Sequence, residues 1–282
     1  MVAQKEKPEA GHAGSPAFNP GVPNVARIYD SLLGGKDNYA ADREAARRLL
    51  DAVPAAGRAA RDNRRFLGRA VWYLAREAGI RQFLDIGTGL PTQGNVHEIA
   101  KTAHSPCRVV YADNDPVVVT HARALLADSL TVTAVQADLR DPDHLLGLPD
   151  VKTFIDWDEP VAVLMVAVLH FLDDRENPWA VVDAYKDRMA PGSYLVVSHV
   201  TGDDTPDDMI RQAAEVYEHA SAPGLARSHA QITRFFDGLE MVAPGLVNPT
   251  QWRGIGPYRK PSPALFYAGV ARKPAGVREA AV

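Results

Sequence analysis

Glycine and acidic residues follow a short apolar run near residue 85. The run over residues 81–86 predicts a strand, and Gly87 and Gly89 come directly after it. Neither glycine has a Cβ atom, so the chain can turn tightly and a ligand can lie against the backbone. In open α/β sheets, a turn between a strand's carboxyl end and a helix is where nucleotides bind. An ordinary strand–helix turn is the alternative. The candidate binding residues of this turn are Asp85, Gly87, Thr88 and Gly89.

Two further apolar runs each end in an acid. Asp113 follows the run over residues 108–112, and Asp138 follows the run over residues 130–137. Nucleotide-binding sheets place an acid at such a position because one carboxylate can accept hydrogen bonds from both ribose hydroxyls. We therefore expect Asp113 and Asp138 at one edge of a parallel sheet, near the glycine turn. The alternative is that both acids only cap the helices that follow.

The charges near the turn favour one adenosyl ligand over another. A dinucleotide fingerprint has a third glycine where this chain has Thr92, the expected N-cap of a helix over residues 92–104. Pro91 removes an N–H group that a pyrophosphate would use, and Asp85 would repel phosphate. S-adenosylmethionine has no phosphate and carries a sulfonium and an ammonium group. The turn therefore suits S-adenosylmethionine better than NAD.

Apolar runs alternate with helical patterns along most of the chain, which predicts an α/β fold. The run over residues 161–169 is apolar on both faces, as expected of a central buried parallel strand. We read residues 148–159 as a polar connection. The predicted strands cover residues 81–86, 108–112, 131–137, 161–169, 194–199, 239–242 and 264–271.

The order of these motifs resembles the class I S-adenosylmethionine-dependent methyltransferases. The segment over residues 24–43 resembles the opening signature of the branch catalogued simply as S-adenosyl methyltransferase, and the resemblance covers roughly residues 23–273. It implies a Rossmann-like, seven-stranded, mostly parallel sheet with an antiparallel terminal hairpin. It also implies S-adenosyl-L-methionine as cofactor, but no particular acceptor. Carried onto the matching motifs, it adds Asn114, Leu139 and His170 to the expected cofactor-binding residues.

Helical patterns before the sheet predict a lid over the cofactor. Helices are expected over residues 25–33, 44–53 with Asp42 as cap, and 59–78. The face of Tyr29 could attract a sulfonium, Lys36 could bind the ligand's carboxylate, and Asp30 its ammonium. A helical segment that merely packs on the sheet domain is the alternative. The expected lid residues that bind cofactor are Tyr29, Gly34, Lys36 and Asn38.

Two histidines end predicted strands and are candidate general bases. His170 follows the run over residues 161–169, and His199 ends the run over residues 194–199. A base is needed only if the acceptor must lose a proton. The alternative is that each is a hydrogen-bonded strand-end residue. Trp252 and Arg253, in a long loop over residues 243–263, could line an acceptor pocket or anchor an exposed loop.

The composition narrows the classes of protein. The 282 residues carry a net charge of −4, which is no basic nucleic-acid footprint. No apolar run is long enough to cross a bilayer, and none near the first residues predicts a signal peptide. Cys107 is the only cysteine, so no intrachain disulfide is possible, and no metal motif occurs. We therefore expect a cytoplasmic protein with no nucleic-acid or membrane partner.

These patterns predict one fold and three functions. We expect a loose tail over residues 1–23, a lid segment over 24–79, a Rossmann-like domain over 80–273 and a tail over 274–282. The favoured function is methyl transfer from S-adenosylmethionine to a small-molecule acceptor. The alternatives are an NAD-dependent oxidoreductase and a non-enzymatic regulatory protein that binds S-adenosylmethionine.

Overall fold

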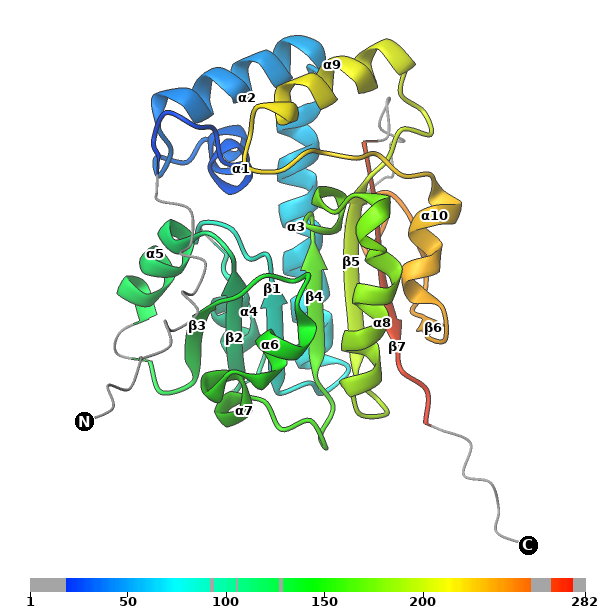
Figure 1. Ribbon diagram of the computed structural model, residues 1–282. Coiled ribbons are helices and arrows are strands. Elements are labelled where there is room, and N and C mark those ends of the chain that lie inside the picture. Colours follow the sequence, from blue (N-terminus) through cyan, green and yellow to red (C-terminus); the bar gives the residue numbers. More distant parts are fainter. Residues whose placement is uncertain (1–18, 92–93, 105, 127–128, 255–264, 276–282) are drawn as a thin grey trace, which may run out of the picture.

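A single seven-stranded sheet forms the centre of the chain (Figure 1). The computed structural model describes residues 19–91, 94–104, 106–126, 129–254 and 265–275. The strand order is β3-β2-β1-β4-β5-β7-β6, with β1–β5 parallel and β7 antiparallel to both β5 and β6. This confirms the predicted Rossmann-like sheet with an antiparallel end. The strands are β1 Gln82–Ile86, β2 Arg108–Asp113, β3 Val132–Gln136, β4 Ala162–Val166, β5 Tyr194–Val200, β6 Glu240–Met241 and β7 Phe266–Arg272.

Helices cover both faces of the sheet because its central strands are apolar on both sides. On one face, α3 (Ala56–Arg76), α4 (Val96–Ala103) and α5 (Pro116–Leu126) bury Phe66, Ala100 and Ala122 against the strands. On the other face lie α6 (Pro142–Gly147), α7 (Pro149–Phe154) and α8 (Pro178–Arg188). The short elements are the 3₁₀ turns η1 Leu169–Phe171, η2 Asp174–Glu176 and η3 Arg234–Phe236, and the helix α10 His229–Thr233.

Three helices form a cap above the carboxyl ends of the strands (Figure 1). They are α1 (Val25–Leu33), α2 (Ala40–Ala52) and α9 (Asp207–Glu218), which share one apolar cluster. The helices of the segment over residues 24–79 are thus joined in the cap by a helix from much later in the chain. In addition, α3 runs from this cap down to the sheet, so it belongs to both layers.

Several expected element boundaries were wrong, including that of the strand expected over residues 161–169, which ends at Val166 and is followed by η1. Asp42 is not the N-cap residue of α2, because the helix begins two residues earlier, at Ala40; it is the third helical residue of a capping box, and its carboxylate accepts the Tyr39 N–H at 2.8 Å. The helix expected over residues 92–104 begins at Val96, where Asn95 and Glu98 form a capping box and Gly94 keeps a left-handed φ of 74°. Thr92 lies outside the described residues. The connection expected over residues 148–159 contains α7.

No helix within the described ranges has the length and apolar character needed to span a membrane.

Candidate active site

A cavity of about 270 Å³ lies between the cap and the carboxyl ends of the parallel strands. Residues after β1, β2, β3 and β4 line its floor, and residues of α1, α2, α3 and α9 line its walls. Its lining includes the turn after β1, which lies at the point of the sheet where the strand order reverses, with β2 on one side of β1 and β4 on the other. In open α/β sheets this reversal point is where ligands bind. The fold therefore assembles the predicted turn and acids around one cavity.

The glycine turn has the tight geometry expected from the sequence. Gly87 and Gly89 have left-handed φ values of 69° and 65°, a region that glycine enters at no steric cost. A Cβ atom on Gly87 would collide with the side chain of Val168. The Gly89 N–H donates to Asp113 Oδ2 at 2.9 Å. The turn after β1 and the acid after β2 are therefore in direct contact.

Two buried carboxyls face the cavity beside this turn. Burial raises the pKa of Asp113 to about 6, although its carboxylate also accepts the Asp115 N–H at 3.0 Å. Burial likewise raises the pKa of Asp85 to about 6, against the stabilising charge of Arg64 and a hydrogen bond from Thr88 Oγ1 at 3.1 Å. Both acids therefore lose their protons about two pH units above an ordinary aspartate.

Two cavity residues on α3 were missed by the sequence reasoning. Asn63 donates to the Tyr29 hydroxyl at 3.0 Å, and Arg64 donates to Asn95 Oδ1 at 3.3 Å. Asn63 Oδ1 and Arg64 Nε are buried without a hydrogen-bond partner. Native proteins rarely leave such atoms unpaired unless a ligand supplies the partner. The signal was present in the sequence, because Asn63 falls on the same apolar helix face as Phe66 and Leu67.

The loops after β2 and β3 contribute a side wall. Asn114, Leu139 and Arg140 line the cavity, whereas Asp138 is not among the lining residues. Asp138 instead pairs with Arg140 at 3.0 Å and accepts from Asn114 Nδ2 at 3.4 Å. Asp138 therefore orients two lining side chains.

His170 lies in the cavity wall on the turn η1. Ala167 has a left-handed φ of 57° directly after β4, and its N–H donates to Ser198 Oγ at 3.0 Å, which turns the chain toward the cavity. The ring of His170 is buried, and its Nδ1 has no partner. Burial, His199 and Arg227 hold the pKa of His170 well below its usual value. The imidazole is therefore neutral and weakly basic at physiological pH, and its Nδ1 can accept a hydrogen bond.

His199 is not a cavity residue. Its ring is fully buried. The next residue, Val200, lines the cavity, but His199 does not. His199 Nε2 accepts from Arg227 at 2.8 Å, which leaves the proton on Nδ1 to be donated to the Val200 carbonyl at 2.7 Å. Burial lowers the pKa of this ring to about 3. Because both nitrogens are engaged within the protein, we remove His199 from the candidate bases.

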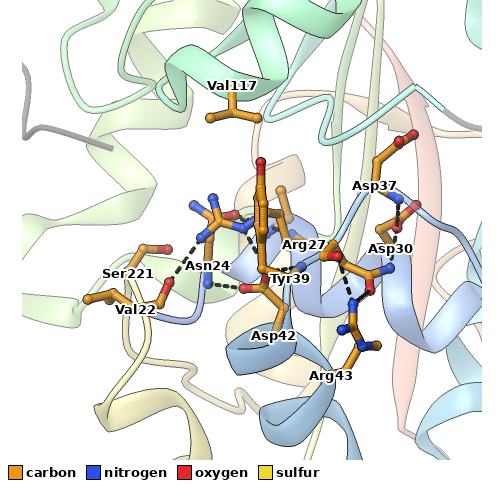
Figure 2. A network of polar contacts seen from close by, with 12 residues as sticks. Val22, Asn24, Arg27, Asp30, Asp37, Tyr39, Asp42, Arg43, Val117 and Ser221 are labelled. Atoms are coloured by element: carbon orange, nitrogen blue, oxygen red, sulfur yellow. Dashed lines mark hydrogen bonds and ion pairs between the residues drawn. The ribbon is translucent and has the colours of Figure 1, made fainter. Parts of the chain in front are cut away.

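The cap loop differs from the expected ligand clamp. Tyr29 lines the cavity, and its hydroxyl donates to the Ala60 carbonyl at 3.0 Å. Gly34, Lys36 and Asn38 are outside the lining residues, and Lys36 is exposed. The carboxylate of Asp30 accepts from Asn38 Nδ2 at 2.7 Å and the Asp37 N–H at 3.1 Å (Figure 2). Asp30 therefore lines the cavity and also orders the loop after α1, whereas Lys36 lies outside the lining residues.

A buried arginine joins the cap to the loop that carries Asp113. Figure 2 shows Arg27 between α1 and α2, where its Nε pairs with Asp42 at 2.8 Å and its Nη2 donates to the Val22 carbonyl at 2.9 Å. Arg27 Nη1 also lies 3.6 Å from Asp115, whose N–H bonds to Asp113. One guanidinium thus sets the cap's position relative to the cofactor-side loop.

The loop residues expected to line an acceptor pocket lie elsewhere. Trp252 is fully buried among core residues, with its ring centroid 5.5 Å from that of Phe66. Arg253 pairs with Glu77 at 2.7 Å and lies 3.9 Å from the ring of Tyr73. Both residues fasten the loop to α3, so of the two expected roles the structure favours the loop anchor over the acceptor pocket.

Sequence and structure comparisons agree with this geometry. Residues 12–274 match the family described as S-adenosyl methyltransferase. The chain belongs to the S-adenosyl methyltransferase family. No curated protein matches it. This family assignment, with the confirmed fold, makes the chain an enzyme that depends on S-adenosylmethionine, and argues against the NAD-dependent alternative.

Solved structures support the same family. A putative methyltransferase from Thermobifida fusca YX is 42% identical, with a TM-score of 0.87, over 92% of this chain and 98% of its own. A DUF574 family protein from Streptomyces avermitilis MA-4680 is 40% identical, with a TM-score of 0.85, over 90% of this chain and 98% of its own. An O-methyltransferase family protein from Burkholderia thailandensis shares the fold alone. It is 17% identical, with a TM-score of 0.51, over 74% of this chain and 55% of its own.

Proposed function

We propose that the cavity binds S-adenosylmethionine at the sheet edge and methylates a small molecule held beneath the cap. The observation that carries this proposal is the contact between the Gly89 N–H and the buried Asp113 carboxylate at the reversal point of the sheet. A carboxylate there is placed to accept ribose hydroxyls, and the glycines let the ligand approach the backbone. The cap encloses the space above, which suits a small acceptor.

The residues present fit the charges of this cofactor. The unpartnered Arg64 Nε and Asn63 Oδ1 lie in the wall near Asp85, so they would meet the amino-acid end, with Arg64 toward its carboxylate and Asp85 toward its ammonium. Asp113 would hold the ribose. Leu139 and Asn114 would pack on the adenine side, with Asn114 oriented by Asp138.

Bound S-adenosylmethionine would supply a methyl group on a cationic sulfur, which is already activated for displacement. The chain's own contribution is then to align the acceptor and exclude water, and positioning of this kind can contribute about 7–11 kcal/mol. His170, neutral and unpartnered at Nδ1, would accept a proton if the acceptor must lose one.

Calorimetric titration of Asp113→Asn tests the cofactor site. The variant keeps the size of the side chain but removes the charge, so S-adenosylmethionine affinity should fall by about 1.5–3 kcal/mol, the contribution of a charged hydrogen bond. Asp150→Asn, at an exposed position in the first turn of α7, is the matched control and should bind normally. Unchanged affinity in Asp113→Asn would remove the ribose assignment.

Transfer of a labelled methyl group from S-adenosylmethionine to a pool of small metabolites tests the acceptor class. Label should appear in low-mass products. Label recovered only in protein or nucleic acid would contradict a small-molecule acceptor. Cofactor binding with no transfer to any pool would favour the regulatory alternative.

A further inference from the structure

The cap side of the cavity is apolar, and this property restricts the acceptor. Met209, Ala213 and Tyr217 are spaced four residues apart, so they form one face of α9 directed at the cavity. Leu49 and Val53 face them from α2, and all five belong to the apolar cluster of the cap. We call the space that these five residues line the apolar compartment.

Charge is confined to the opposite surface of α9. Arg211, Glu215 and Glu218 on that helix are exposed and do not line the cavity. Among the described lining residues of the cap, only Asp30 and Arg64 are charged, and Asp30 is bonded to its own loop. Transfer of an unpaired charge from water into such a space is strongly unfavourable. The apolar compartment therefore selects against acceptors that carry a carboxylate, phosphate or ammonium group.

Aromatic rings surround His170 at the boundary between the compartment and the sheet edge. The His170 ring centroid lies 4.3 Å from that of Phe171 and 6.1 Å from that of Phe266. The Phe171 ring in turn lies 5.7 Å from Tyr217 of the compartment. Flat rings pack favourably against one another in offset or edge-on arrangements. This setting suits an aromatic acceptor next to the histidine.

Two unpaired polar atoms indicate the functional group of that acceptor. Thr205 and His170 both line the cavity, and Thr205 Oγ1 and His170 Nδ1 are buried without a partner. A hydroxyl and a neutral imidazole can together bind one O–H group, because each can accept its proton and the threonine can also donate. Rotation about χ1 changes the direction of the Thr205 hydroxyl.

We propose, on the basis of the proposed function, that the acceptor is an uncharged aromatic molecule methylated on a ring hydroxyl, with Thr205 and His170 binding that hydroxyl. The hydroxyl oxygen forms a bond to the methyl carbon as the carbon–sulfur bond breaks, and sulfur keeps the electron pair. The hydroxyl proton passes to His170 and then to water. A phenolic proton, with a pKa of about 10, suits the weakly basic ring of His170 better than an aliphatic alcohol does.

The test compares three ligands that share one ring system. A naphthol, the matching naphthoate and the matching naphthylmethylammonium are titrated calorimetrically into protein saturated with S-adenosylhomocysteine. Naphthol should bind at least about tenfold more tightly than either charged analogue, because burying an unpaired charge opposes their binding. Equal or tighter binding of a charged analogue, or no binding of any of the three, overturns the inference. Failure to bind S-adenosylhomocysteine in the first step overturns the proposed function instead.

Two variants test the named residues. Thr205→Val removes the hydroxyl but keeps the shape, so naphthol affinity should fall about fivefold while naphthalene affinity falls less. Ala213→Asp places a carboxylate on the inner face of α9, so naphthol binding should weaken and naphthylmethylammonium binding should strengthen. S-adenosylhomocysteine binding shows that each variant is folded. An equal loss for naphthol and naphthalene in Thr205→Val contradicts the hydroxyl contact.

Discussion

Burial determines the charge of the residues that surround the cavity. Asp85 and Asp113 are held at a raised pKa of about 6, while His170 is held neutral. Burial is the main cause at both acids; at Asp85 the charge of Arg64 offsets burial only in part, and repulsion by Asp113 adds a smaller effect. A ligand with an ammonium group or ribose hydroxyls would favour the ionised acids. The site should therefore couple cofactor binding to proton release.

The affinity for S-adenosylmethionine should depend on pH near 6. Below that value Asp113 and Asp85 gain protons and lose their attraction for the ligand, so affinity should fall about tenfold between pH 8 and pH 5. Calorimetric titration across this range measures the effect. Asp113→Asn should show a shallower dependence than the wild type, and identical slopes would contradict the assignment to Asp113.

The raised pKa of Asp85 and Asp113 affects the stability of the ligand-free protein in the opposite direction from cofactor affinity. The folded pKa of each acid lies above its unfolded value, so the folded state binds more protons between pH 4 and pH 6. These two groups therefore lower the free energy of unfolding as the pH rises through that window. Bound S-adenosylmethionine should remove this decrease in the free energy of unfolding.

At the scale of elements, a buried arginine holds the turn that carries His170. Arg227 donates to the carbonyls of Leu169 and Leu172 at 3.1 and 2.8 Å, on either side of the histidine. It also pairs with Asp174 at 2.6 Å and bonds His199. His199 thus supports η1 indirectly, which explains its burial at the end of β5.

Arg227→Met should destabilise the protein by about 3 kcal/mol, because buried carbonyls would lose their donor. Urea unfolding measures this change. Arg175→Met is the matched control, since its side chain is 89% exposed and pairs only at the surface, so it should change stability by less than about 0.5 kcal/mol. Similar losses in both variants would show that the buried bonds around η1 contribute little.

Arg27 has a comparable role for α1 and α2. Its guanidinium is buried between Asp42 and Asp115, so Arg27→Met would leave carboxylates without a cation and should cost about 3 kcal/mol. The exposed Arg47→Met in α2 is the control and should be nearly neutral. Urea unfolding measures the effect of Arg27→Met on stability, and S-adenosylmethionine titration measures its effect on cofactor affinity. If affinity is unchanged, the cap is not coupled to the Asp113 loop.

At the scale of the whole molecule, the cavity lies between the sheet and a cap built from two segments far apart in the sequence. Ser221 Oγ accepts the Val25 N–H at 3.2 Å, which joins the segment after α9 to the start of α1. A ligand in the cavity would contact both layers, so its binding should stabilise the whole fold.

S-adenosylmethionine at about 100 times its Kd should therefore stabilise the protein by about 2.7 kcal/mol, which raises Tm by about 5 °C. Scanning calorimetry measures this shift. NAD at the same concentration is the control and should leave Tm unchanged. A larger shift with NAD would contradict the cofactor assignment.

Local patterns were enough to predict the sheet and one half of the site. The buried runs of β1–β5, the glycine turn and the acids after the strands all follow short-range rules, because parallel strands bring their carboxyl ends to one edge. The terminal hairpin came from the family resemblance. Asp85, Asp113 and His170 were therefore placed from sequence alone, as was Tyr29 in the cap.

Tertiary packing decided the rest. The sequence could not show that α9 completes the cap, since no local signal links residues 207–218 to residues 25–52. It could not separate His170 from His199 either, because each comes at the end of an apolar run in the sequence. Only the packed structure gives His199 two partners and leaves His170 against the cavity, since Arg227 approaches from a distant segment. Local sequence sets which groups reach the edge, and long-range packing sets which of them stay available.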